Sequence, residues 1–66
     1  MVLSKEPVTL ETAKLRIGAG VVYRAYPGAQ IEDGDITRVT DRFVFVRFVG
    51  DRQPKAVSPE MLEWAL

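Results

Sequence analysis

The residues of this 66-residue chain that could bind a partner are arginines and aromatics on predicted strands. We predict that they share one outward-facing surface, with Arg24 and Tyr26 beside Phe45 and Arg47, and with two further arginines nearby, Arg38 and Arg42. Arginine and aromatic side chains are enriched where interfaces carry their binding energy. The same combination suits stacking on nucleic-acid bases with neutralisation of phosphates. A third interpretation stays open, in which ordinary surface arginines pair across strands with Asp35 or Asp41.

Catalytic chemistry has little support in the residue types. The chain has no His, so neither Ser4 nor Ser58 can have an imidazole that activates its hydroxyl group. It has no Cys, which removes disulfides and thiolate metal ligands. Glu32, Asp33 and Asp35 surround a single glycine, a pattern more typical of a solvated turn than of a hard-cation site. We therefore predict no catalytic residue, no metal and no cofactor.

Composition limits the size and the setting of the fold. Sixty-six residues form one domain, and a chain of this length buries only about 60% of its unfolded surface, so oligomerisation would help it. Nine basic and nine acidic residues give zero net charge, which counts against a protein that coats nucleic acid. No apolar run approaches the roughly 20 residues of a membrane span, and no signal-peptide pattern is visible. We expect a cytoplasmic protein without membrane contact, with homo-oligomerisation left open.

The predicted strands are organised around Arg42 to Val49, the longest run of β-branched and aromatic residues. Strand side chains alternate between two faces, and Arg47 marks one face as solvent-exposed. The other face is predicted to be core: Val44, Val46 and Phe48. Phe43 and Phe45 then lie outward, where the N-terminal helix, a partner or a second copy would have to cover them.

Four further segments are predicted to be strands: Val21 to Tyr26, Asp35 to Val39, Lys55 to Val57 and Glu63 to Leu66. In the first of them, the inward set is Val21, Tyr23 and Ala25. Ile36 and Val39 are three residues apart, so a β-bulge is needed if both face inward. Turn signals separate the strands at 27–30, 32–34 and 40–41.

Two short helical segments complete the predicted elements. Thr9 to Leu15 has Thr9 as a suitable N-cap, and it is too short to be stable without packing on the sheet. In Ser58 to Leu62, a serine N-cap is followed by proline at the first helical position. We expect residues 1–14 to form an N-terminal arm with the short helix, and residues 15–66 to form the β domain.

These elements resemble an SH3-like barrel in their order. The resemblance is carried by the glycine-rich opening and the strand patterns of four segments: Leu15 to Tyr23, Gly34 to Val39, Phe45 to Phe48 and Ser58 to Trp64. It implies a mainly β fold, a small five-stranded SH3-like barrel with a short N-terminal helix and a one-turn helix before the last strand.

More narrowly, the series is similar to a group of small phage- and prophage-encoded proteins, most of which have no assigned role. Four features occur in the same order: a tyrosine-containing first strand, an acidic-glycine turn, a Val-Phe-Val-Arg-Phe strand and a Pro-Glu-x-Leu-Glu-aromatic ending. This resemblance covers residues 15–64. It implies a phage or prophage origin and supplies no catalytic residues.

We therefore predict a non-catalytic binding module in the cytoplasm of a host cell. It would dock on a host or phage protein as an inhibitor, adaptor or accessory factor. One alternative is nucleic-acid binding through the arginines at positions 24, 38, 42 and 47, which would show strong salt dependence. A second alternative is a minor structural role in a virion.

Overall fold

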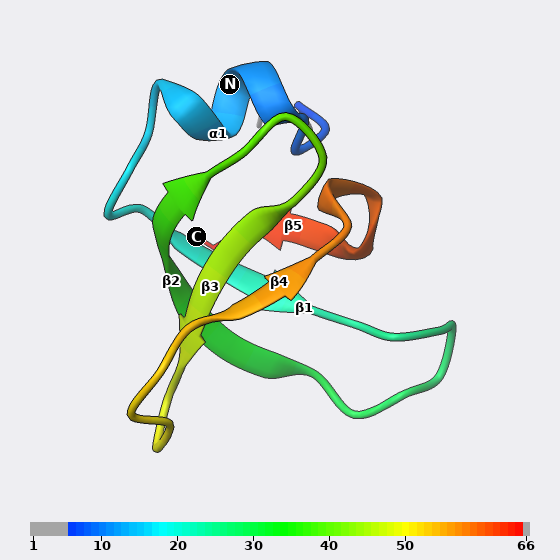
Figure 1. Cartoon of the computed structure of the whole chain (residues 1–66). Helices are drawn as coiled ribbons and strands as arrows, with labels where there is room; N and C mark the ends of the chain where they lie inside the picture. Colours follow the sequence, from blue (N-terminus) through cyan, green and yellow to red (C-terminus); the bar gives the residue numbers. More distant parts are fainter. Residues whose placement is uncertain (1–5, 66) are drawn as a thin grey trace.

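The computed structural model describes residues 6–65 and holds one five-stranded antiparallel sheet with a short helix at one end (Figure 1). The strands are β1 (Gly20–Tyr23), β2 (Glu32–Val39), β3 (Val44–Phe48), β4 (Lys55–Val57) and β5 (Leu62–Trp64). Helix α1 (Leu10–Lys14) precedes the sheet, and the 3₁₀ turn η1 (Pro59–Met61) separates β4 from β5. The mainly β prediction is confirmed. The predictions for residues 1–5 and 66, which began the arm and ended the last strand, lie outside the described residues.

The sheet is curled but not closed. Its strand order is β4-β3-β2-β1-β5, so β4 and β5 form its two edges. The predicted barrel is therefore not observed, because within residues 6–65 these two strands share no ladder. The curl still brings both edges to one core, since Leu62 of β5 lies in it and Val57 of β4 packs against it.

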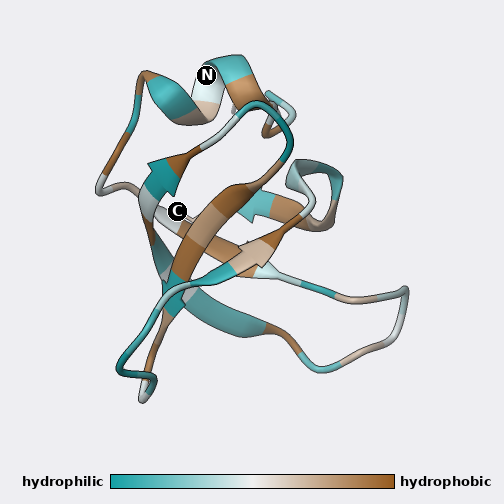
Figure 2. Ribbon diagram, in the orientation of Figure 1, coloured by the Kyte–Doolittle hydropathy of each residue, from teal (hydrophilic) through white to brown (hydrophobic). Residues whose placement is uncertain are grey.

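The core consists of eight buried side chains from the helix region and four of the strands: Val8, Ala13, Val21, Ile36, Val44, Val46, Phe48 and Leu62. The predicted inward face of β3 is confirmed, since Val44 and Val46 are 0% exposed and Phe48 is 6% exposed. Figure 2 shows β3 as a hydrophobic strand beside a hydrophilic first part of β2. The rings of Tyr23 and Phe48 pack in a T-shaped arrangement, with 5.6 Å between the ring centroids.

Strand β2 begins earlier than predicted, because the segment from Glu32 to Gly34 is strand and not a turn. Gly34 is buried and pairs with Val21 on one side and with Phe48 on the other. A Cβ atom at this position would lie 2.5 Å from Cγ1 of Val46 and 2.8 Å from the Arg47 carbonyl oxygen. The glycine thus permits close packing inside the sheet. From the sequence alone, such a glycine cannot be distinguished from a turn glycine.

The predicted β-bulge in β2 is confirmed. Ile36 pairs with Val46, and the next register position pairs Arg38 with Phe45, so Thr37 is the extra residue. Without the bulge, Arg38 would stand opposite Val44, on the buried face. The bulge moves Arg38 outward and lets Val39 take the place opposite Val44, where it packs against the core.

Strand β1 is shorter than predicted. It ends at Tyr23, so Arg24 and Tyr26 lie in the following loop, and Ala25 is exposed rather than in the core. The Arg24 N–H donates to the carbonyl oxygen of Met61 in η1, at 3.1 Å. This loop is the long connection between β1 and β2 that extends away from the sheet in Figure 1.

Helix α1 packs at one end of the core, beside β2. Thr9 is its N-cap as predicted, and Thr9 and Thr12 form a capping box. Val8 and Ala13 are buried in the common core, so this part of the predicted arm packs with the sheet. Ser58 is the N-cap of η1 by position, although its side chain makes no capping hydrogen bond.

Candidate binding site on the outer face of the sheet

The register fixes which side chains share the outer face of the sheet, because cross-strand partners lie on the same side. Three rows result. The row at the bulge contains Arg38, Phe45 and Ala56, the next contains Gly20, Asp35 and Arg47, and the last contains Val22, Asp33 and Glu63. Basic side chains therefore lie toward the bulge and acidic side chains toward the opposite end.

Arg38 and Phe45 form a stacked pair at the bulge. The guanidinium carbon lies 4.4 Å from the centroid of the phenyl ring, a cation–π geometry. On its other side, Phe45 faces Ala56, whose methyl group is too small to cover the ring. Phe45 is consequently half-buried on a face where a larger neighbour would have hidden it.

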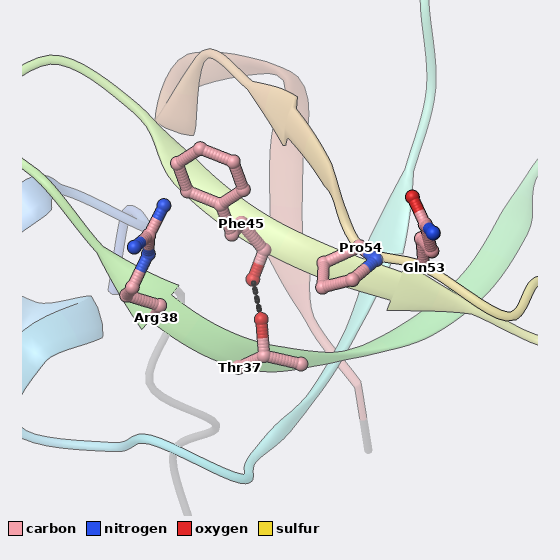
Figure 3. A pocket seen from close by; sticks show the side chains of 5 residues that line it. All are labelled: Thr37, Arg38, Phe45, Gln53 and Pro54. Atoms are coloured by element: carbon pink, nitrogen blue, oxygen red, sulfur yellow. Dashed lines mark hydrogen bonds between the residues drawn. The ribbon is translucent and has the colours of Figure 1, made fainter.

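An open hollow of about 410 Å³ lies beside this pair and is lined by Thr37, Arg38, Phe45, Gln53 and Pro54. We call the site formed by these five residues the bulge hollow. Figure 3 shows that they belong to β2, to β3 and to the segment that leads into β4. Thr37 Oγ1 donates to the Phe45 carbonyl oxygen at 3.2 Å, which ties the bulge to β3. The volume lies in the range of small-ligand and side-chain pockets, roughly 300–1,000 Å³.

Two residues that line the hollow, Arg38 and Gln53, have exposed polar side chains. Arg38 has no carboxylate within ion-pair distance among residues 6–65, where the ion pairs are Arg16 with Glu6 and Lys55 with Asp51. Gln53 is exposed, and Pro54 adds an apolar surface without an N–H group. The site thus combines a cation, an amide and two apolar rings.

The other predicted site residues are not gathered at the hollow. Arg47 lies in the adjacent row, opposite Asp35 as the cross-strand interpretation requires, but no salt bridge joins them. Arg42 is exposed in the β2–β3 turn, where its N–H donates to Thr40 Oγ1 at 3.3 Å. Arg42 is close in sequence to Arg38 and Phe45 of the row at the bulge, but it does not line the hollow.

Arg24 and Tyr26 lie in the loop after β1, not on a strand as predicted, and they do not line the hollow. Arg24 follows Tyr23, which pairs with Glu32, whereas Phe45 pairs with Arg38. The predicted strand placement of these two residues was wrong because β1 ends at Tyr23, before Arg24.

Three residues of the hollow were missed from the sequence: Thr37, Gln53 and Pro54. The signal for Thr37 was available, because the spacing of Ile36 and Val39 already required a bulge. For Gln53 and Pro54, the pairing of β3 with β4 had to be known before their place beside Phe45 could be inferred.

Charge divides the chain unevenly. Residues 36–58 carry five basic and two acidic side chains, whereas the remaining described residues carry three basic and seven acidic ones. On the outer face, Val22 lies between Asp33 and Glu63, and Asp35 is two positions beyond Asp33 on β2. The face thus has a basic end at the hollow and an acidic end at β1 and β5.

Within residues 6–65, no three His, Cys, Asp or Glu side chains are grouped so that they could hold a metal ion. No helix of this part of the chain has both the length and the apolar character needed to cross a membrane. The sequence matches no protein family model, and no curated protein or solved structure is significantly similar to it. The function is therefore inferred from the residues of the chain itself.

Proposed function

We propose that this chain is a non-catalytic binding module of phage or prophage type, with an SH3-like arrangement of its strands, that docks on a host or phage protein through the bulge hollow. The carrying observation is the exposed stack of Arg38 on Phe45 beside an open hollow. Arginine and aromatic residues in one partly desolvated site are the side chains on which interface energy is concentrated.

The order of elements supports the SH3-like part of the proposal. The resemblance implies five short strands with one helical turn before the last, and residues 6–65 form five strands with η1 between β4 and β5. The curled sheet, with residues from both edges around one core, is the form from which such a barrel would close. Pairing of β4 with β5 would complete it.

The non-catalytic part rests on the residue types. The chain has neither His nor Cys, and the hollow itself offers a guanidinium, an amide and a hydroxyl group. An arginine side chain stays protonated in proteins and so cannot act as a general base. The hydroxyl of Thr37 already donates to a backbone carbonyl.

A protein partner is favoured over nucleic acid by the arrangement of charge. A nucleic-acid strand presents phosphates continuously and needs a basic track along its length. On this sheet, the basic end gives way within two rows to Asp33 and Glu63. Such a face would repel an extended polyanion but would accept a short segment of a protein.

The test is an affinity capture from bacterial lysate, with and without nuclease, read by mass spectrometry. Three proteins are immobilised: the wild type, Phe45→Ala, and Val49→Ala, a control that removes an apolar side chain that is 84% exposed outside the hollow. We expect one dominant protein that survives nuclease, is retained by Val49→Ala and is lost with Phe45→Ala. Circular dichroism must show that Phe45→Ala remains folded.

Other outcomes contradict the proposal. Recovery that collapses with nuclease would favour the nucleic-acid alternative, which is then checked by its salt dependence. Capture that is equal for Phe45→Ala and the wild type would remove the hollow from the interface. Unfolding of Phe45→Ala would mean that this ring belongs to the core.

A further inference from the structure

The guanidinium group of Arg38 is held in place without being neutralised. Its carbon lies over the Phe45 ring, 4.4 Å from the ring centroid, and no carboxylate of residues 6–65 lies within ion-pair distance of it. A stacked guanidinium has fewer conformations to lose when a partner binds. It also presents a fork of N–H donors that matches both oxygens of a carboxylate.

Next to this cation, the hollow is apolar. The ring of Pro54 and the exposed part of Phe45 line it, and Thr37 turns its hydroxyl to the backbone of β3. An apolar side chain entering here would remove these surfaces from water without displacing a needed hydrogen bond. A cation beside an apolar surface is complementary to a short partner segment that carries both a carboxylate and an apolar side chain.

Addition of a strand to the free edge of β4 is poorly supported. The carbonyl of Phe45 accepts from Thr37 and so points to β2, which leaves Val44 and Val46 to bond with β4. Of the three β4 residues, Ala56 alone then directs its backbone groups outward. Pro54, just before β4, has no N–H to offer. A partner is therefore held by side chains rather than by a backbone ladder.

We infer that the bulge hollow takes an acidic segment of a protein partner, in which an Asp or Glu carboxylate pairs with Arg38 and a neighbouring apolar side chain lies against Pro54 and Phe45. This inference rests on the proposed function and specifies the chemistry of its partner. The basic excess of residues 36–58 attracts such a segment, and the acidic end of the sheet, at Asp33 and Glu63, limits it to the hollow.

The test is an NMR titration of the ¹⁵N-labelled chain with two synthetic peptides and a deoxythymidine oligonucleotide. One peptide alternates glutamate with phenylalanine, and the other has glutamine at each glutamate position. We expect the glutamate peptide to bind about tenfold more tightly, since its contact with Arg38 is charge-assisted. The amides that shift should include those of Thr37, Arg38, Phe45 and Gln53.

Two variants separate a specific contact from general attraction. Arg38→Gln should bring the two peptides to equal affinity. Arg24→Gln removes the same charge from an exposed arginine in the loop after β1, outside the hollow, and should keep the tenfold difference. Comparison of the two variants is valid because both change the net charge by one.

The inference is overturned if the peptides bind the wild type equally, if both variants behave alike, or if the shifted amides lie elsewhere. It is also overturned if the oligonucleotide binds these amides more tightly than the glutamate peptide. The proposed function is tested separately: a lysate protein that is lost with Phe45→Ala but captured by Arg38→Gln as by the wild type would keep the binding module and discard the acidic segment.

Discussion

The two ends of β2 show opposite solutions to packing within one strand. Near the first end, Gly34 pairs with β1 and β3 and has no room for a Cβ atom, because such an atom would overlap Val46 and the backbone of Arg47. At the other end, the bulge at Thr37 opens the sheet and leaves Arg38 and Phe45 stacked beside a hollow.

The difference shows where this small chain has freedom to bind. Gly34 and Arg38 are four positions apart on β2, so a closely packed scaffold and an open site share one strand. A Cβ atom at Gly34 would overlap β3, whereas the side chains of Arg38 and Phe45 border an open hollow. Substitutions at the first end should therefore change stability, and those at the second should change binding.

The largest effect is expected from Gly34→Ala. The new Cβ atom would meet Val46 Cγ1 and a backbone oxygen, and relief of this overlap should cost about 3 kcal/mol of the free energy of unfolding. Gly20→Ala is the matched control, because its nearest new contact is Ala65 Cβ at 3.4 Å, an ordinary distance. Urea denaturation measures both. Similar midpoints for the two variants would show that β2 can shift at Gly34.

The next effect tests the face assignment of β3. Val46→Ala removes two methyl groups from a fully buried side chain and should cost about 2 kcal/mol, from lost burial and the cavity left behind. Val49→Ala makes the same change just after β3, where the side chain is 84% exposed, and should alter stability by less than about 0.5 kcal/mol. Equal losses in urea denaturation would contradict the inner face as described.

Sequence patterns located the core of the sheet because strong local signals agreed with the packing. Alternation in β3 selected Val44, Val46 and Phe48, and the spacing of Ile36 and Val39 required the bulge that is observed. Thr9 was recognised as an N-cap from its position before a helical pattern. In each of these places, one segment holds all the information that the prediction needs.

The predictions failed where a residue's role depends on another strand. Gly34 has the sequence context of a turn, and only its neighbours on β3 reveal that it is a packing glycine. Arg24 was placed near Phe45 because β1 was expected to continue past Tyr23. The stack of Arg38 on Phe45 joins two residues on that predicted surface, whereas Gln53 and Pro54 depend on pairing between strands.

A smaller loss is expected from Thr37→Val, which keeps the shape of the side chain and removes its hydrogen bond to the Phe45 carbonyl oxygen. The free energy of unfolding should fall by about 1 kcal/mol, as for a typical partly buried hydrogen bond. Because this bond ties the bulge to β3, hydrogen exchange at the Phe45 amide should also accelerate relative to Val21. If exchange at the two amides changes equally, the backbone pairing of β2 with β3 holds the bulge without a contribution from the Thr37 hydroxyl.

The smallest change in stability is expected from Arg38→Gln. We compare it with Arg16→Gln, because Arg16 is a second arginine that lies over an aromatic ring. Arg16 lies 4.9 Å from the Trp64 ring centroid and also pairs with Glu6 at 3.2 Å. Arg16→Gln removes both contacts and should cost about 1 kcal/mol, since Trp is the best cation–π partner and the half-exposed ion pair adds little.

Arg38→Gln removes only a stack on phenylalanine at an exposed site and should cost about 0.5 kcal/mol. In peptide binding the order of the two variants should be reversed. Arg38→Gln should lose the tenfold preference for the glutamate peptide over the glutamine peptide, whereas Arg16→Gln should retain it. Urea midpoints and peptide titrations of both variants give a crossed pattern if the bulged end of β2 is a binding site. Should Arg38→Gln be the more destabilising of the two, Arg38 holds the sheet together at the bulge, and the two ends of β2 are alike in serving the fold.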